Sequence, residues 1–200
     1  MSTEQATPEA FTLYLTRILF MRTPRHLLFS VLLALLPALA RAEASTPDSP
    51  TLRANQVAHV VHGILSYARW PQQHDTLRLC VIAPTEYTDQ LWQNHELESR
   101  QPVQVRRLLV DSPQLETECE AVYLGVIAEN QRLELFNRLV GKPILTISES
   151  SKACSEGSLF CLNISDEHVA FKVNLDAVAR SGIRIHPNVL QLGKRAGPQP

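Results

Sequence analysis

The sequence predicts an α/β protein with a mainly parallel central sheet, helices on both faces and an antiparallel hairpin at a C-terminal edge. Short apolar runs alternate with helical patterns along residues 54–193, and parallel strands need crossovers of this kind. The runs at 77–83 and 121–128 are apolar at nearly every position, which is typical of strands covered on both faces. Two further runs, 159–164 and 169–173, are separated by only four residues, a spacing that favours a hairpin.

The first half of the domain is predicted to alternate helix, strand, helix and strand. A helix is expected over 54–70, and it should end before Pro71 because the residue preceding a proline avoids helical backbone. A strand over 77–83, a helix over 88–97 and a strand over 103–110 follow. The apolar positions that recur at helical intervals in the first segment are Val57, Val60, Val61, Ile64 and Leu65.

The second half is predicted to continue the alternation and then to change. After the buried strand at 121–128, a helix is expected over 131–140, which Gly141 should end. A strand over 143–147 precedes the hairpin, whose antiparallel strands should extend one edge of the sheet. The remaining elements are a short helix over 175–181 and an apolar segment over 183–192.

A secretory leader is predicted before the domain. Basic residues at Arg22, Arg25 and His26 precede an apolar run, 27–40, and the small-x-small site that ends at Ala42. The run is too short to cross a bilayer, which needs about 20 residues. Residues 21–42 are therefore read as a signal peptide, and the mature chain is expected in the periplasm.

The rest of the chain divides around this leader. Residues 1–20 carry two acidic residues and a second apolar patch, which do not suit the start of a signal peptide, so we read them as a non-native extension. Residues 43–53 are expected to be a flexible spacer, 54–193 a single domain and 194–200 a disordered tail.

Composition and motifs exclude several functions. The chain has 19 basic and 20 acidic residues, so no bulk positive field for nucleic acid is expected. It contains no nucleophile elbow, glycine-rich phosphate loop or zinc-protease helix. The adjacent pair Asp166 and Glu167 is read as turn charges. We expect neither an enzyme nor a cofactor.

Four cysteines predict two disulfides, because an even count in an exported chain favours bonded pairs. Cys154 and Cys161 bracket a turn-forming segment, so a local loop is easy to close. This leaves Cys80 to pair with Cys119. Cys80 lies within the apolar run at 77–83, and Cys119 lies just before the run at 121–128. No metal site is expected, because the cysteine spacing fits no zinc motif and His59 and His62 lack further ligands nearby.

Two polar pairs are candidate ligand-binding residues. Arg69 and Trp70 place a cation beside an aromatic ring at the predicted helix end, although Trp70 there has the alternative role of filling the core. Arg184 and His186 alternate with apolar residues, so on an extended segment both would project the same way. They suit a small anionic or aromatic ligand, with simple surface polarity as the alternative.

Five segments of the predicted domain form a recognisable set: 67–71, 77–82, 141–147, 171–175 and 180–185. Together they resemble the YfiR-like periplasmic family, which carries the DUF4154 domain. The likeness covers residues 54–193, and the order and spacing of the segments are more specific than any one of them. The chain differs from the family just before the predicted strand at 159–164. Family members often have Gly-Gly at this place, whereas this chain has Ser-Glu-Gly-Ser at 155–158, between Cys154 and Cys161.

The resemblance implies a negative regulator that binds the periplasmic domain of an inner-membrane diguanylate cyclase of the YfiN type. Such a repressor would hold cyclic-di-GMP synthesis, and with it biofilm formation, low. A YfiB-type outer-membrane lipoprotein is expected to sequester it, and disturbance of the disulfides is expected to weaken repression.

The partner surface and a second function class are further hypotheses. We expect the cyclase to contact a face around Ser155, Phe160 and Arg180, because an aromatic side chain beside a disulfide-fixed loop is a rigid anchor. A homodimer is expected as the commonest closed assembly. The alternative is a periplasmic sensor domain that binds a small molecule through Arg69, Trp70, Arg184 and His186.

Overall fold

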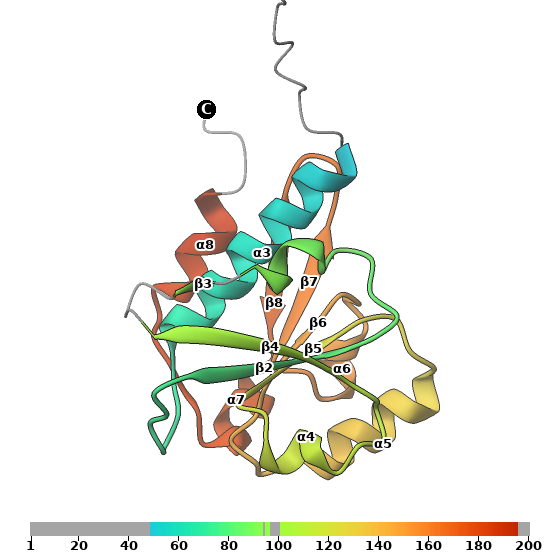
Figure 1. Cartoon of the computed structure of the whole chain (residues 1–200), viewed down its shortest axis with the longest axis vertical. Coiled ribbons are helices and arrows are strands. Elements are labelled where there is room, and N and C mark those ends of the chain that lie inside the picture. The colour runs from blue at the N-terminus through green and yellow to red at the C-terminus, as the bar shows by residue number, and fades with distance from the viewer. Residues whose placement is uncertain (1–48, 94, 97–100, 196–200) are drawn as a thin grey trace, which may run out of the picture. The chain divides into compact units, whose positions relative to one another are not determined.

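A seven-stranded, mainly parallel sheet forms the centre of the protein in the computed structural model (Figure 1). Its order is β3-β4-β2-β5-β6-β7-β8, with parallel inner strands and an antiparallel strand at each edge. The predicted fold class, including the hairpin of β7 and β8, is confirmed. The strands are β2 (Leu77–Ile82), β3 (His95–Glu96), β4 (Pro102–Leu108), β5 (Ala121–Leu124), β6 (Leu145–Ser148), β7 (Phe160–Ile164) and β8 (Val169–Val173).

The structure describes residues 49–93, 95–96 and 101–195. The predicted extension, signal peptide and start of the spacer lie outside the described residues, as does most of the predicted tail. No helix in the described part of the chain is long and apolar enough to cross a membrane.

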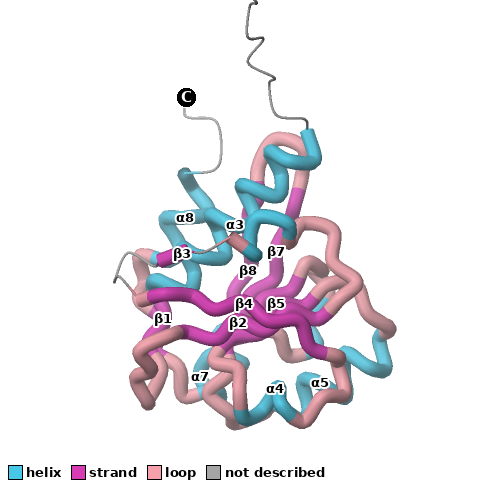
Figure 2. The backbone as a smooth tube through the Cα atoms, in the orientation of Figure 1, coloured by secondary structure: helices cyan, strands magenta, loops and turns pink. Residues whose placement is uncertain are grey.

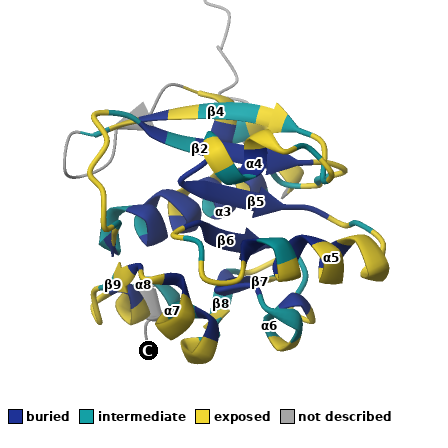
Figure 3. Cartoon of the chain, turned by 90° about the horizontal axis from the view of Figure 1, so that it is seen from below, coloured by how far each residue is buried: buried dark blue, intermediate teal, exposed yellow. Residues whose placement is uncertain are grey.

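Helices cover both faces of the sheet, and each face has its own core (Figure 3). Helix α3 (Ser49–Tyr67) packs beside α8 (Val189–Arg195) on one face, together with the 3-10 turn η3 (Asp89–Trp92). On the other face lie α4 (Gln114–Thr117), α5 (Glu129–Leu139) and α6 (Ala153–Glu156). All five apolar positions predicted for the first helix are buried.

A separate two-stranded ribbon joins the two ends of the domain. Strand β1 (Ala68–Arg69) follows α3 directly (Figure 2), and it pairs antiparallel with β9 (Arg184–Ile185). Helix α7 (Leu175–Ser181) precedes β9 and is capped by Asn174, whose Oδ1 accepts from the backbone N–H of Ala177 at 2.9 Å. The ribbon explains why α3 ends at Tyr67, before the predicted boundary at residue 70.

The first helix also begins earlier than predicted. Ser49 starts α3, so the end of the predicted spacer is helical. Pro50 does not prevent this, because proline is tolerated in the first turn of a helix, where its missing N–H has no intrahelical partner anyway. Arg53 forms an ion pair with Asp166 in the β7–β8 turn, which further fixes this end. Likewise, α8 runs to Arg195 and includes the start of the predicted tail.

The helix predicted over 88–97 is wrong. The described residues of this segment form η3, followed by β3. Leu91 is fully buried, whereas Trp92 is largely exposed, so this stretch lacks the apolar stripe that would hold a longer helix on the sheet. The last residues pair instead with the start of β4.

Strand β5 is shorter than the predicted 121–128 because the chain turns at Gly125. A Cβ at that position would lie 1.9 Å from the carbonyl oxygen of Pro84. Only glycine allows this approach, and Val126 N–H donates to the same carbonyl at 2.8 Å. The predicted stop after α5 is present, and Gly141 there has φ +74°.

Candidate functional site

The β1–β9 ribbon brings together three of the four predicted ligand residues. Arg69 lies directly opposite Arg184 in the antiparallel register, and residues opposite each other project to the same face. Both side chains are exposed. Arg69 Nη1 donates to the carbonyls of Ser66 and Ala68, each at 2.7 Å. In the described part of the chain, no carboxylate forms an ion pair with either arginine.

His186 extends this face next to an aromatic ring. It stacks on Tyr67 with a centroid separation of 6.0 Å and an interplanar angle of 27°, and its backbone N–H donates to the Tyr67 carbonyl at 2.9 Å. The Nδ1 atom accepts from the N–H of Asn188 at 3.2 Å, which leaves Nε2 as the donor. Two guanidinium groups, an imidazole donor and a phenol ring thus share one small surface, a set that suits an aromatic anion.

Trp70 does not join this face. Its indole Nε1 donates to the carbonyl of Glu120 at 2.9 Å, and its ring is packed against the core. Together with Arg69, Trp70 lines a hollow of about 370 Å³ at the amino ends of β2 and β5. Because side chains alternate along an extended chain, Arg69 and Trp70 turn to different sides, and the core-filling alternative describes Trp70 better.

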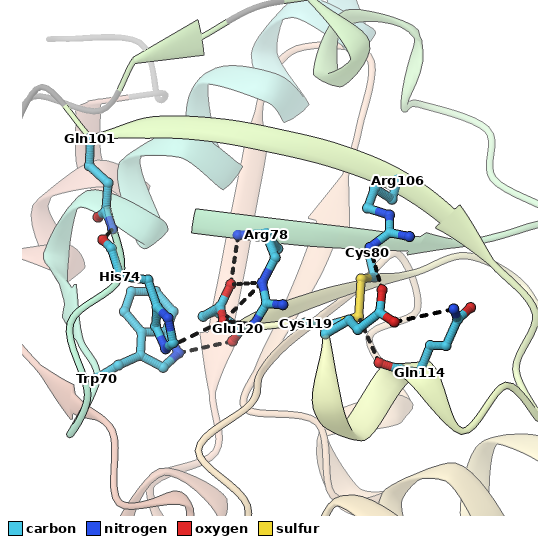
Figure 4. Close-up of polar contacts among 10 residues, drawn as sticks. Trp70, His74, Arg78, Cys80, Gln101, Arg106, Gln114, Cys119 and Glu120 are labelled. Atoms are coloured by element: carbon cyan, nitrogen blue, oxygen red, sulfur yellow. Dashed lines mark hydrogen bonds and ion pairs between the residues drawn. A yellow bond between two sulfur atoms is a disulfide. The ribbon is translucent and has the colours of Figure 1, made fainter. Parts of the chain in front are cut away.

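A buried ion pair lies beneath this hollow (Figure 4). The Glu120 carboxylate accepts from the Arg78 guanidinium through Nε and Nη2, and from the Arg78 backbone N–H at 2.7 Å. His74 Nε2 approaches the same carboxylate at 3.5 Å. Burial raises the pKa of Glu120, but the hydrogen bonds and charge of Arg78 outweigh burial and hold it below the ordinary value.

Sequence reasoning missed this pair, although a signal was present. Arg78 lies two residues before Cys80 and Glu120 directly follows Cys119. If the two cysteines are bonded, the opposite charges that flank them must also lie close together.

Both disulfides join the predicted pairs. Cys80 in β2 is bonded to Cys119, just before the neighbouring strand β5, and both cysteines are buried. Cys154 in α6 is bonded to Cys161 in β7. Cys161 is buried, whereas Cys154 is half-buried beside a hollow of about 490 Å³. The second disulfide is therefore the more accessible of the two.

The predicted partner residues divide into two groups. Ser155 and Arg180 are exposed and line the hollow beside Cys154. Phe160, in contrast, is fully buried and contacts Phe171 edge to face. It is not a surface anchor, because the first three residues of β7 are buried, so this part of the strand is covered on both faces. Asn174 connects the walls of this hollow, donating from Nδ2 to the Cys154 carbonyl at 2.6 Å.

A half-buried carboxylate, Glu149, lies just after the end of β6 and holds a loop. Glu149 accepts from the backbone N–H groups of Glu86 and Tyr87 at 3.1 Å, and from the Tyr123 hydroxyl at 2.9 Å. Burial raises the pKa of Glu149 above its ordinary value, although these donors and the side chain of Tyr123 act in the opposite direction. The loop after β2 is thus tied to the end of a central strand.

The fold is thus that of an α/β domain cross-linked by two disulfides. A family model described as YfiR/HmsC-like, DUF4154, matches residues 54–194, and the chain belongs to this family. The family is periplasmic, regulatory and non-catalytic, so the protein is a periplasmic regulator of this general kind that acts through protein interactions.

Proposed function

We propose that the protein represses an inner-membrane diguanylate cyclase of the YfiN type by binding its periplasmic domain. Membership of the YfiR/HmsC-like family over most of the domain is the observation that carries this proposal. A YfiB-type outer-membrane lipoprotein would relieve repression by competing for the regulator. Repression would keep cyclic-di-GMP and biofilm formation low.

The first experiment measures cellular cyclic-di-GMP after deletion of the gene and restoration with or without residues 21–42. Deletion should raise cyclic-di-GMP, and only the form that carries the leader should lower it again. An unchanged level after deletion would contradict repression. Equal rescue by both forms would contradict action from the periplasm.

The hollow beside Cys154 is our candidate for the cyclase-binding surface. Ser155 on α6 and Arg180 on α7 supply exposed polar side chains, and Asn174 connects the two elements. The disulfide from Cys154 to Cys161 fixes α6 against the sheet. Its reduction would free one wall of the hollow, which gives a physical route for redox relief of repression.

Two arginine substitutions, one in the hollow and one elsewhere as a control, test whether this surface binds the cyclase. Arg180→Gln should weaken co-purification with the periplasmic domain of the cyclase and raise cyclic-di-GMP. Arg106→Gln, near the opposite edge of the sheet, removes the same charge from a surface pair and should change neither. Melting temperatures of the purified variants exclude misfolding as the cause, and equal binding by both variants would remove the hollow from consideration.

Binding of a small aromatic anion is the second candidate function, and the β1–β9 ribbon favours it. Like charges directly opposite each other across two strands are destabilising, so an anion that bridges Arg69 and Arg184 would stabilise the folded state. Aromatic carboxylates should raise the melting temperature of the protein, and Arg184→Gln should abolish the shift. A shift that survives this substitution would place the ligand elsewhere.

The expected homodimer is tested by light scattering on the purified protein. A mass that corresponds to two chains, unchanged over a tenfold dilution, supports it, and the mass of one chain contradicts it. Such a dimer would present each of the surfaces above twice.

A further inference from the structure

Part of the outer edge of β4 is not paired with any described strand. In the sheet order, β4 lies between β2 and the two-residue strand β3, which pairs with Pro102 and Val103. Beyond Val103, β4 continues to Leu108 with β2 on its inner side and no described strand on its outer side. Figure 3 shows this stretch at the margin of the sheet, with exposed and half-buried residues along it.

The pairing with β3 indicates which residues of β4 point outward. Because Pro102 has no N–H, the hydrogen-bonded pair of this antiparallel ladder is Val103 with His95, so the peptide groups of Val103 point to the outer edge. Such groups alternate between the two edges of a strand, which also places the N–H and C=O groups of Val105 and Arg107 on the outer edge. Neither of these two residues forms a backbone hydrogen bond beyond the sheet ladder among the described residues.

The two arginines of this stretch do not close the edge. Adjacent residues of a strand point to opposite faces; Arg106 forms an ion pair with Glu118, and the Arg107 guanidinium lies over the Trp92 ring, with Cζ 5.4 Å from the centroid. Proteins often protect an edge strand with proline or a β-bulge. Residues 104–108 contain no proline and pair with β2 in unbroken register, so the outward backbone groups are accessible to another strand.

The charges of β4 discriminate between the strands that could pair there. A second copy of the chain would use both outward residues by antiparallel pairing about Arg106. This would place two Arg106 side chains directly opposite each other, and like charges in that position are destabilising. Strand β4 has two arginines and no acidic residue, and Arg107 forms no ion pair with a described carboxylate. A strand with acidic side chains would instead form opposite-charge pairs across the ladder.

We propose that the outer edge of β4 binds an extended, acidic segment of a partner protein, which adds to the sheet as a further strand. The main-chain groups of Val105 and Arg107 would form the hydrogen bonds, and an acidic side chain beside Arg107 would give selectivity. This edge shares no residue with the hollow beside Cys154 or with the β1–β9 ribbon. The proposal therefore does not depend on the proposed repressor function.

A short fluorescent peptide in which glutamate alternates with valine is a suitable probe. It should bind the purified protein saturably in fluorescence anisotropy. Binding should be lost when every backbone amide nitrogen of the peptide is methylated, because this peptide cannot donate hydrogen bonds to an edge strand. Lysine in place of glutamate should weaken binding by about fivefold. Failure of the glutamate peptide to bind, or equal binding of the methylated peptide, would overturn the proposal.

Substitutions at Arg107 test whether the peptide binds at this edge. Arg107→Gln removes the charge and should weaken binding by about two- to fivefold. Arg107→Pro also removes the outward N–H and should weaken it by about tenfold or more; proline is tolerated there because this N–H takes no part in the ladder with β2. Lys172→Gln, at an exposed position on the opposite edge strand β8, is the matched control and should leave binding unchanged. Equal weakening by Arg107→Gln and Lys172→Gln would contradict a site on β4.

Trp92 provides a test that does not depend on the folding of the proline variant. A strand on this edge would lie beside Arg107 and Trp92, so the unlabelled glutamate peptide should change the tryptophan fluorescence of the wild type but not that of Trp92→Phe, which retains Trp70. An equal change in both proteins would place the peptide elsewhere. A dimer that light scattering detects in the wild type and that Arg107→Pro dissociates would assign the edge to a second copy and overturn the proposal. Melting temperatures equal to that of the wild type exclude misfolding of the variants.

Discussion

The two disulfides should contribute unequally to stability, and their loop lengths set the difference. Cys80 and Cys119 are 39 residues apart, whereas Cys154 and Cys161 are 7 apart. In the chain-entropy model, closure of these loops stabilises the fold by about 4 and about 2.5 kcal/mol, respectively. The long loop is thus expected to contribute about 1.5 kcal/mol more.

Burial adds to this difference in the same direction. The two sulfur atoms of the long loop lie in the core that covers the α5 face of the sheet, whereas Cys154 is half-buried. Removal of the long-range bond therefore also loosens packing between β2 and β5. The measured difference in unfolding free energy should accordingly be at least as large as the entropic value.

Urea unfolding of two double variants measures this difference. Cys80→Ala with Cys119→Ala should lower the free energy of unfolding by about 4 kcal/mol, and Cys154→Ala with Cys161→Ala by about 2.5 kcal/mol. The two variants remove the same atoms, so each serves as the control for the other. Equal losses, or a larger loss for the short loop, would refute the reasoning from loop length and burial.

Four further substitutions, one of them a control, probe two carboxylates and one close backbone contact. Glu120→Gln should lower the free energy of unfolding by about 2–3 kcal/mol at neutral pH, because it leaves a guanidinium half-buried without its charge partner, whereas Glu118→Gln, in a more exposed pair, should lower it by less than about 1 kcal/mol. The pKa of Glu120 is depressed on folding, so the ionised carboxylate stabilises the folded state at pH values above the unfolded pKa. This stabilisation should be lost as pH falls through the folded pKa. Urea unfolding at several pH values should show this loss of unfolding free energy in the wild type and not in Glu120→Gln. The pKa of Glu149 is raised on folding, so the ionised carboxylate destabilises the folded state. The wild type should therefore lose unfolding free energy relative to Glu149→Gln as pH rises through the folded pKa. A difference between the two proteins that stays constant across this pH range would contradict this. Gly125→Ala should lower the melting temperature strongly, since the added Cβ would overlap the Pro84 carbonyl oxygen, and a melting temperature equal to that of the wild type would contradict the required approach.

Much of the fold is predictable from the sequence because buried parallel strands have a strong local signature. The runs around β2 and β5 are apolar on both faces, and the amphipathic pattern of α3 is long enough to be unambiguous. The segment at 88–97 was not predictable, because its polarity permits a short helix and only tertiary packing decides against one. Among its described residues, Leu91 is the one buried apolar side chain, and it gives no periodicity from which a turn and a helix could be distinguished.

The candidate sites were predictable in part for a similar reason. Alternation along an extended segment correctly placed Arg184 and His186 on one side, but nothing local indicates that Arg69 lies opposite. Phe160 was misassigned because an aromatic residue beside a turn resembles a surface anchor until the position of its strand in the sheet is known. A hollow of about 620 Å³ at the carboxyl ends of β4, β2 and β5 depends on strand order, which no local pattern determines.

The β1–β9 ribbon also constrains when a binding surface can form as the chain folds. Arg69 and Arg184 are paired across most of the domain's length, so their pairing closes a very long loop and is a late, non-local event in folding. Because β9 lies close to the C-terminal end of the domain, an incomplete chain cannot form this surface until nearly all of the domain is present. Any ligand that needs both arginines would therefore recognise only completed molecules, and a chain truncated before β9 would be unable to bind it.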